Sequence, residues 1–183
     1  MYWKITTEQA LRLLRKYNID SARIAHCRGV SYFAYSLAEK IARRNPKLRI
    51  NPEKVRLAAL LHDIGRGEPG DHEINSVIIL KREGLDELAS LVIHGTIYEI
   101  FLLRGKNDPS LLPHSVENKI VAYADSRYKD HLVSMEERWA EIEKRRSNQK
   151  EKLESLQMAK ERFRNMEKEL LKLAGKDPES VDS

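Results

Sequence analysis

Apolar residues recur along most of the chain at intervals of three and four, the spacing of one face of an α-helix. The clearest stripe runs through residues 21–44 and consists of His26, Val30, Phe33, Leu37 and Ile41. Few segments alternate apolar and polar residues with a period of two, the pattern of a half-buried strand. The pattern therefore predicts an all-α protein.

Capping residues and prolines predict where these helices begin and end. Thr6 and Gln9 read as a capping box that opens a helix to about residue 17. Asp20 or Ser21 should cap a helix that runs to about residue 44, and Asn51 should cap one that carries an apolar run to residue 63. Further helices are expected over three ranges, namely 72–84, 86–94 and 116–125. Residues 98–113 combine helix-like and loop-like features.

From about residue 129 to residue 174 the chain is dense in charge and lacks glycine. Its apolar stripe lapses at residues 145–149 and then resumes, which fits either one long helix or a helical hairpin. The stripe needs a surface to cover it, either the core of the same domain or a second protomer. We expect a helical domain over residues 1–128, a charged helical extension over 129–175 and a disordered tail over 176–183.

Composition narrows the class of protein. The chain has 183 residues, 41% of them hydrophobic, enough for one sizeable core. Its net charge of +5 comes from interspersed basic and acidic residues, so a solvated surface is favoured and nucleic acid is an unlikely partner. The single cysteine, Cys27, excludes an intramolecular disulfide and a cysteine-rich zinc module. Without a signal-peptide pattern or a membrane-spanning apolar run, we expect a soluble, cytoplasmic protein.

Six titratable residues interrupt the apolar faces or lie at predicted helix ends. They are His26, His62, Asp63, His72, His94 and Asp125. A single inward-facing histidine is usually a core residue hydrogen-bonded to a neighbour, but burying six titratable groups without a shared partner would be very costly. A cation among them would remove that cost.

The donor types indicate which cation. Imidazoles and carboxylates without thiolates suit a first-row divalent metal, with Mn, Fe, Ni, Co and Zn all admissible. Four such ligands would hold one ion, whereas six suggest two. A carboxylate such as Asp63 could bridge two ions, because it offers two oxygens where an imidazole offers one nitrogen. Adjacent helical residues diverge by about 100°, so Cys27 is expected to point away from the metal if His26 points toward it.

The order of these residues resembles that of the HD-domain superfamily of metal-dependent phosphohydrolases, in its HDIG subgroup. His62 and Asp63 stand in the sequence His-Asp-Ile-Gly after an Ala/Leu-rich run, and the likeness covers roughly residues 20–130. The flanking stretches AHCRGV, DHEINS and AYADSR resemble the family's other histidine and aspartate motifs. The resemblance implies a compact HD-type helical bundle.

The same resemblance implies roles for individual residues. His26, His62, Asp63 and Asp125 would bind the first metal, and His72 and His94 would bind a second, with Asp63 as the bridge. Arg66 stands where the mononuclear nucleoside-phosphatase branch has a glutamate. It occupies the place of a basic residue that contacts the substrate phosphate, since a guanidinium can grip two phosphate oxygens at once.

The implied function is metal-dependent hydrolysis of a phosphomonoester, phosphodiester or phosphoanhydride bond in a small, nucleotide-like substrate, with Asp63 and Arg66 at the catalytic centre. The chain lacks the paired histidine near His94 and the Gly-Tyr-Pro of HD proteins that cleave cyclic dinucleotides, which weakens that specificity. Two alternatives stay open: an HD-fold di-iron oxygenase, and a non-catalytic metal-stabilised regulatory or interaction module. A homodimer formed through the C-terminal helices is a further expectation.

Overall fold

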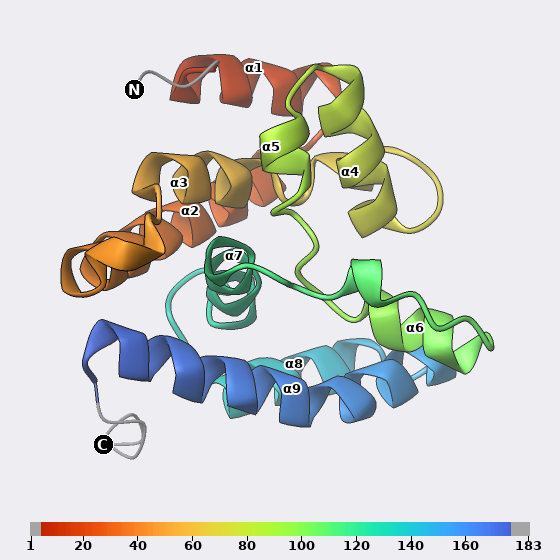
Figure 1. Ribbon diagram of the computed structural model, residues 1–183. Helices are drawn as coiled ribbons and strands as arrows, with labels where there is room; N and C mark the ends of the chain where they lie inside the picture. Colours follow the sequence, from red (N-terminus) through yellow and green to blue (C-terminus); the bar gives the residue numbers. More distant parts are fainter. Residues whose placement is uncertain (1–4, 177–183) are drawn as a thin grey trace.

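The computed structural model describes residues 5–176, which form an all-α bundle (Figure 1). Its α-helices are α1 (Thr7–Lys16), α2 (Ser21–Arg44), α3 (Pro52–Leu61), α4 (His72–Arg82), α5 (Asp86–Ala89), α6 (Ile97–Leu103), α7 (Val116–Ser126), α8 (Met135–Arg145) and α9 (Lys150–Ala174). Short 3-10 turns are η1 (Pro46–Leu48), η2 (Ile64–Gly67) and η3 (Pro109–Leu111). Residues 5–176 contain no strand, so the predicted fold class is confirmed.

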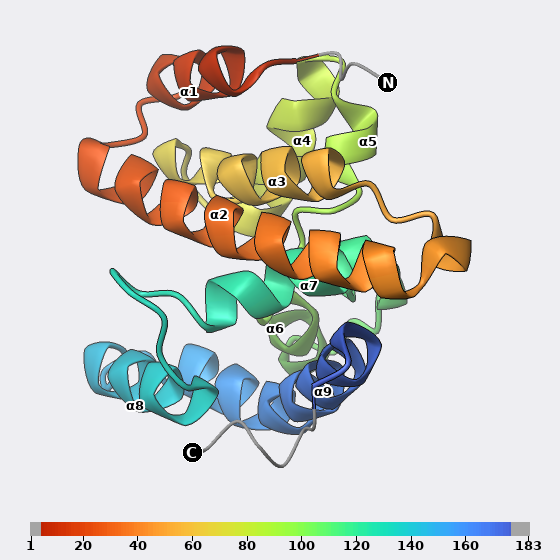
Figure 2. The ribbon, with the colours of Figure 1, turned by 90° about the vertical axis from the view of Figure 1, so that its left-hand side faces the viewer.

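The helices lie in layers around α7. On one side of α7 is the α2–α3 pair, with α1, α4 and α5 beyond it; on the other side are α6, α8 and α9 (Figures 1 and 2). α7 packs against α2, α3 and α9, so it is the central element. One continuous core cluster extends from Leu14 in α1 through Leu60 and Tyr123 to Trp139 and Phe163.

The predicted helix starts at the N-terminal end of the chain are confirmed by their caps. The Thr6 hydroxyl accepts a hydrogen bond from the Gln9 amide at 3.2 Å, and the Gln9 side chain accepts one from the Thr6 amide at 2.7 Å. The Asp20 carboxylate accepts from the Arg23 amide at 2.7 Å. These bonds satisfy donors that a helix terminus would otherwise leave unpaired.

The predicted helix over residues 86–94 is wrong beyond Ala89, where α5 ends. The chain that follows finds its backbone partners outside a helix. The Asn118 side chain donates to the carbonyls of Leu91 and Ile93, each at 2.8 Å, and a buried carboxylate accepts from the amides of residues 94 and 95. Side chains thus satisfy the backbone groups of this apolar segment, and His94 lies on an irregular stretch of chain.

The predicted end of the helix over residues 52–63 is nearly right. α3 ends at Leu61, His62 is its C-cap and Asp63 precedes the turn η2. Gly65 in that turn packs closely on α4, because a Cβ at this position would lie 2.2 Å from the His72 carbonyl oxygen. The Ser76 hydroxyl donates to the His62 carbonyl at 2.8 Å and accepts from the Gly65 amide at 2.9 Å. The His-Asp-Ile-Gly motif is therefore fixed against the start of α4.

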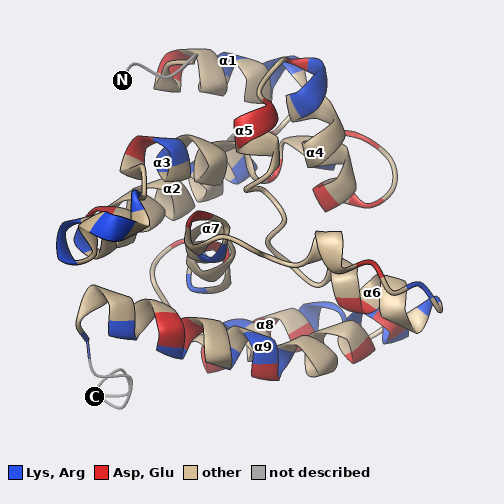
Figure 3. Cartoon of the chain, viewed as in Figure 1, with Lys and Arg blue, Asp and Glu red and all other residues tan. Residues whose placement is uncertain are grey.

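The C-terminal segment is a hairpin of α8 and α9. Its apolar stripe is covered by the domain core, one of the two surfaces expected to cover it. α9 packs on α2, α6 and α7. The residues of its stripe that are buried in the main cluster are Leu156, Phe163, Met166 and Leu170. Basic and acidic residues are interspersed along both helices (Figure 3). α9 ends at Gly175, whose φ of 68° suits glycine, and the tail expected to be disordered lies outside the described residues apart from Lys176.

α2 and α9 are long enough to cross a bilayer. Neither these nor the other helices between residues 5 and 176 contain a stretch apolar enough to do so.

Candidate metal centre

The structure brings all six candidate side chains together from five segments of the chain. His26 comes from α2, His62 and Asp63 from the end of α3, His72 from the first residue of α4, His94 from the irregular stretch, and Asp125 from the last turn of α7. His62, Asp63 and His94 are buried. The predicted convergence therefore holds in space, although these residues are up to 99 positions apart.

The six residues form two groups of three. In the first, Asp125 Oδ1 lies 3.0 Å from His26 Nε2 and 3.4 Å from His62 Nε2. In the second, Asp63 Oδ1 lies 3.4 Å from His72 Nε2 and 3.5 Å from His94 Nε2. Within each group the candidate donor atoms all lie within 4.8 Å of one another, as they would around a single ion.

Asp63 lies between the two groups. Its Oδ1 faces His72 and His94, whereas its Oδ2 is 3.6 Å from His62 Nε2. The Arg66 Nε and an Arg23 guanidinium nitrogen also donate to Oδ2, at 2.6 and 3.1 Å. Burial favours the neutral acid most strongly, but His62, His94 and Arg66 together hold the pKa of Asp63 well below its usual range. The ionised carboxylate thus offers one oxygen to each group.

The imidazole rings are held by their outer nitrogens. His62 Nδ1 is 2.7 Å from the Ala59 carbonyl oxygen, and His94 Nδ1 is 2.7 Å from that of Val92. A carbonyl only accepts, so each Nδ1 carries a hydrogen and each ring turns its Nε2 toward the centre. His62 Nε2 and Asp63 Oδ1 are buried there without any hydrogen-bond partner. Two orphaned acceptors among imidazoles and carboxylates fit a divalent cation.

Comparison with known proteins identifies the family. The chain matches the HD domain family over residues 23–130, more than half of its length. The chain belongs to the HD domain family. It is also 36% identical over 127 residues to the uncharacterized protein MJ0778 of Methanocaldococcus jannaschii, a match that covers 65% of this chain and 73% of that protein. No solved structure matches the chain.

The family match has two consequences. It places the protein in a superfamily of metal-dependent hydrolases, and all six candidate residues fall within the matched range. The α8–α9 hairpin lies outside that range, although it packs on the same core as the HD domain.

Glu73 is a buried acidic residue of this HD domain that sequence reasoning missed. Its Oε2 accepts hydrogen bonds from the amides of His94 and Gly95 at 2.9 and 2.8 Å. Gly95 is needed there, because a Cβ at that position would lie 2.6 Å from Glu73 Oε1. Acidic residues are common in the first turn of a helix, so nothing in the sequence distinguishes Glu73 from a solvated one. Glu73 accepts these hydrogen bonds only because the chain around His94 is not helical, and the hydrophobic pattern does not predict this irregular segment.

Cys27 departs from its expected placement. Its sulfur lies within 4.8 Å of ligand atoms of His62 and Asp63 instead of pointing away from the centre. The reason is that α2 packs on both α3 and α7, so neighbouring residues on α2 can contact different parts of one site. Burial, the largest influence, together with the charges of Asp63 and Asp125, raises the pKa of the Cys27 thiol well above its usual value. The thiol therefore stays neutral and lies buried beside His62 and Asp63.

The metal-free centre should make stability depend on pH. Burial and the charge of His94 lower the pKa of His72 to about 4, whereas Glu73 and Asp63 outweigh burial and raise that of His94 to about 9. His72 is thus neutral and His94 charged at neutral pH. The raised pKa of His94 contributes stability that is complete below pH 6.5 and is lost as the pH rises to about 9. The lowered pKa of His72 contributes stability above pH 6.5 that is lost as the pH falls to about 4.

We therefore expect the free energy of unfolding of the metal-free protein to be greatest near pH 6.5. It should fall by on the order of 3 kcal/mol between pH 6.5 and 9, because over that interval folded His94 keeps a proton that the unfolded chain has released. Urea denaturation of chelator-treated protein across this range measures it. His114→Gln, which removes an exposed histidine, should leave the profile unchanged. A profile that is flat or rises from pH 6.5 to 9 would contradict the assignment of the extra proton to His94.

A cavity of about 320 Å³ opens on the centre. Arg23, Arg66, His72, His94 and Asp125 line its inner end. The α8–α9 hairpin forms the opposite wall, whose apolar part consists of Trp139, Ile142, Leu156 and Phe163 and which also carries four cationic side chains.

The hairpin is also bonded to the stretch that carries His94. An Arg162 guanidinium nitrogen donates to the Gly95 carbonyl at 3.0 Å, and the same side chain pairs with Glu99 at 2.8 Å. The hairpin wall of the cavity is therefore fixed relative to the metal centre. A small molecule in the cavity would be held between the hairpin and the metal centre.

Proposed function

We propose that this HD-domain protein is a metal-dependent phosphohydrolase that cleaves a phosphate ester or anhydride bond in a small, nucleotide-like substrate. The observation that carries the proposal is the pair of buried, unpartnered ligand atoms, His62 Nε2 and Asp63 Oδ1, next to a cavity that their partners His72, His94 and Asp125 line together with Arg66. A purely structural metal site needs no such access, whereas a catalytic one does.

The ligands would be divided between two divalent ions. His26, His62 and Asp125 would hold one, His72 and His94 the other, and Asp63 would contribute an oxygen to each. When bound, such ions lower the pKa of water to near neutrality and neutralise charge on a phosphoryl group. The carbonyls of Ala59 and Val92 keep the rings of His62 and His94 in the ligating tautomer and orientation.

Arg66 has the position of a phosphate-binding residue. Its Nε is committed to Asp63, and no other partner for its guanidinium occurs among residues 5–176, so its terminal nitrogens are available to the cavity. Its side chain is about one-third exposed, which leaves it accessible to a substrate. Arg66 would bind phosphate oxygens and offset the charge that develops on them.

The test is hydrolysis by chelator-treated protein reloaded with Mn²⁺, Co²⁺, Ni²⁺, Zn²⁺ or, without air, Fe²⁺. A panel of phosphomonoesters, phosphodiesters and dinucleoside polyphosphates is assayed in water enriched in ¹⁸O. We expect metal-dependent turnover of at least one class, with one ¹⁸O atom in a phosphate-containing product. Turnover that instead requires dioxygen, or the absence of turnover by protein that has bound metal, would overturn the proposal in favour of an oxygenase or a binding module respectively.

A further inference from the structure

The wall of the cavity opposite the metal centre carries unneutralised positive charge. Six cationic side chains line the cavity as a whole, Arg23, Arg66, Arg138, Arg145, Arg146 and Lys152, and four of them belong to the hairpin. The lining carboxylates are Asp71, Glu73 and Asp125. None of these three comes from the hairpin, so no carboxylate lines the hairpin side of the cavity.

The lining carboxylates are committed elsewhere. Glu73 accepts from two backbone amides, and Asp125 faces His26 and His62. Asp71 lies 3.5 Å from Arg104, which is not a lining residue. No lining carboxylate therefore compensates the cations of the hairpin.

The individual partners of these cations support this conclusion. Arg146 and Lys152 have no ion pair among residues 5–176, and Arg145 approaches Glu141 only to 3.6 Å. One Arg138 nitrogen pairs with Glu141, but its Nε is buried without any hydrogen-bond partner, in a side chain that is 9% exposed. Burial and the charges of Arg145, Arg66 and Arg138 lower the pKa of Arg146, as expected where positive groups face one another unscreened.

Resting on the proposed function, we propose that the hairpin forms a second anion-binding subsite and that the substrates are small molecules carrying at least two phosphate groups. One phosphate lies at the metal centre with Arg66, and another lies against Arg146, Lys152 and the buried Arg138. The apolar side chains that line the cavity, Trp139, Ile142, Leu156 and Phe163, accommodate an uncharged part of the substrate. A cavity of about 320 Å³ is at the lower end of the size range of small-molecule sites and too small for a folded partner.

Because the hairpin lies outside the residues matched to the HD domain, this subsite is a feature of the extension. The HD domain would cleave the bond, and the hairpin would select for the second phosphate. The free energy of binding the second phosphate to the hairpin would also help to position the scissile phosphate at the metal centre.

The test compares AMP with two probes that carry one more phosphate, ADP and adenosine 3′,5′-bisphosphate. Their dissociation constants are measured by calorimetry on the full-length, Mn²⁺-loaded protein, first for the wild type and then for the double variant Arg146→Gln with Lys152→Gln. We expect at least one two-phosphate probe to bind the wild type tenfold or more tightly than AMP. The double variant should lose that preference while its affinity for AMP changes less than threefold.

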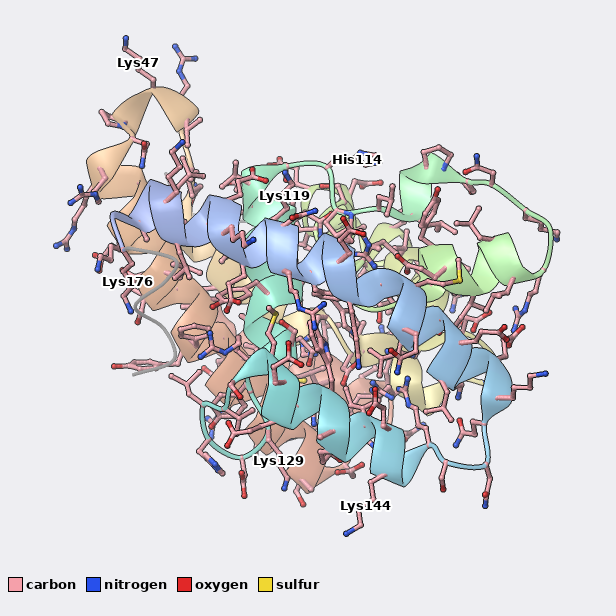
Figure 4. The ribbon with its side chains drawn as sticks, turned by 90° about the horizontal axis from the view of Figure 1, so that it is seen from below. Lys47, His114, Lys119, Lys129, Lys144 and Lys176 are labelled. Carbon is pink, nitrogen blue, oxygen red and sulfur yellow. The ribbon has the colours of Figure 1, made fainter. Side chains whose placement is uncertain are left out.

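Lys144→Gln is the matched control. Lys144 lies on α8, one turn or less from the lining residues, and its side chain projects away from the body of the molecule (Figure 4). The Lys144→Gln substitution removes one positive charge, where the double variant removes two, and does not touch the cavity, so it should not change any of the three constants. An equal effect of Lys144→Gln would show a general electrostatic attraction and overturn the subsite.

Other outcomes separate this inference from the proposed function. Hydrolysis by the wild type without any preference for a second phosphate would overturn the subsite and leave the phosphohydrolase intact. A preference that persists in a protein with no hydrolytic activity would retain the anion site and overturn the phosphohydrolase. A short RNA that binds more tightly than every mononucleotide probe, with an affinity that the double variant loses, would assign these cations to nucleic acid and overturn the small-molecule subsite.

Discussion

Asp63→Asn should reduce hydrolysis by roughly 10³-fold or more, which corresponds to about 4 kcal/mol of transition-state stabilisation. The substitution keeps the shape of the side chain but replaces one oxygen by an amide nitrogen and removes the negative charge. Asp63 is the only one of the six residues whose two oxygens face different groups of ligands, so the change weakens both at once. Metal content, measured by mass spectrometry after dialysis, should fall in parallel with activity.

The control is Asp130→Asn, which neutralises an exposed aspartate near the end of α7. It should retain the activity and metal content of the wild type. Circular dichroism and a thermal midpoint show whether each variant is folded. Folded Asp63→Asn protein with wild-type activity would eliminate the bridging role and, with it, the proposed mechanism.

The His26 and His72 variants distinguish the two groups of ligands from a single cluster. Each of His26→Gln and His72→Gln removes a ring from a different group, and each ring is partly exposed, so the fold should tolerate the loss. Each variant should contain about one metal ion fewer per chain than the wild type. A variant that loses all its metal would show that the six residues hold their ions cooperatively rather than as two separable sites.

The centre could be predicted from the sequence largely because its ligands lie on or beside regular helices. The stripe that contains His26 shows which way that residue faces, and the apolar run before His62 shows that it ends a buried helix. Helical periodicity thus reports the orientation of a polar residue as well as of its apolar neighbours. The order of the six residues along the chain, together with the family resemblance, then predicts which of them bind the same metal ion.

The features that could not be predicted depend on contacts between distant segments. Asn118 and Glu73 satisfy the backbone of residues 91–95, and without them that segment reads as a continuation of α5. The placement of Cys27 depends on how α2 packs on α3 and α7, which no local pattern encodes. The same holds for the hairpin. The sequence shows that the apolar stripe lapses at residues 145–149, between α8 and α9. The cavity that the hairpin closes arises only when α9 packs across α6 and α7, which the sequence does not show.

Glu73→Ala should cause a large loss of stability although Glu73 is not one of the six candidate ligands. It leaves the amides of His94 and Gly95 buried without an acceptor and removes a carboxylate that faces charged His94 in the metal-free protein. Unpaired buried donors cost about 1–3 kcal/mol each, so the free energy of unfolding should fall by about 3 kcal/mol or more. Urea denaturation at pH 7.5 measures it, and Glu154→Ala, which removes an exposed helical glutamate, should change it by less than about 0.5 kcal/mol.

The same substitution tests whether Glu73 acts through His94 or only supports the fold. His94 is positioned by its backbone contact with Glu73 and by the Val92 carbonyl, so loosening the first should lower metal affinity by roughly 10- to 100-fold. Glu73→Gln keeps an oxygen that can accept both amides, and it should recover most of the stability and part of the metal affinity. A Glu73→Ala protein that is destabilised but binds metal as tightly as the wild type would restrict Glu73 to a structural role. Recovery of both properties by glutamine would instead assign its effect to the geometry of the two hydrogen bonds rather than to its charge.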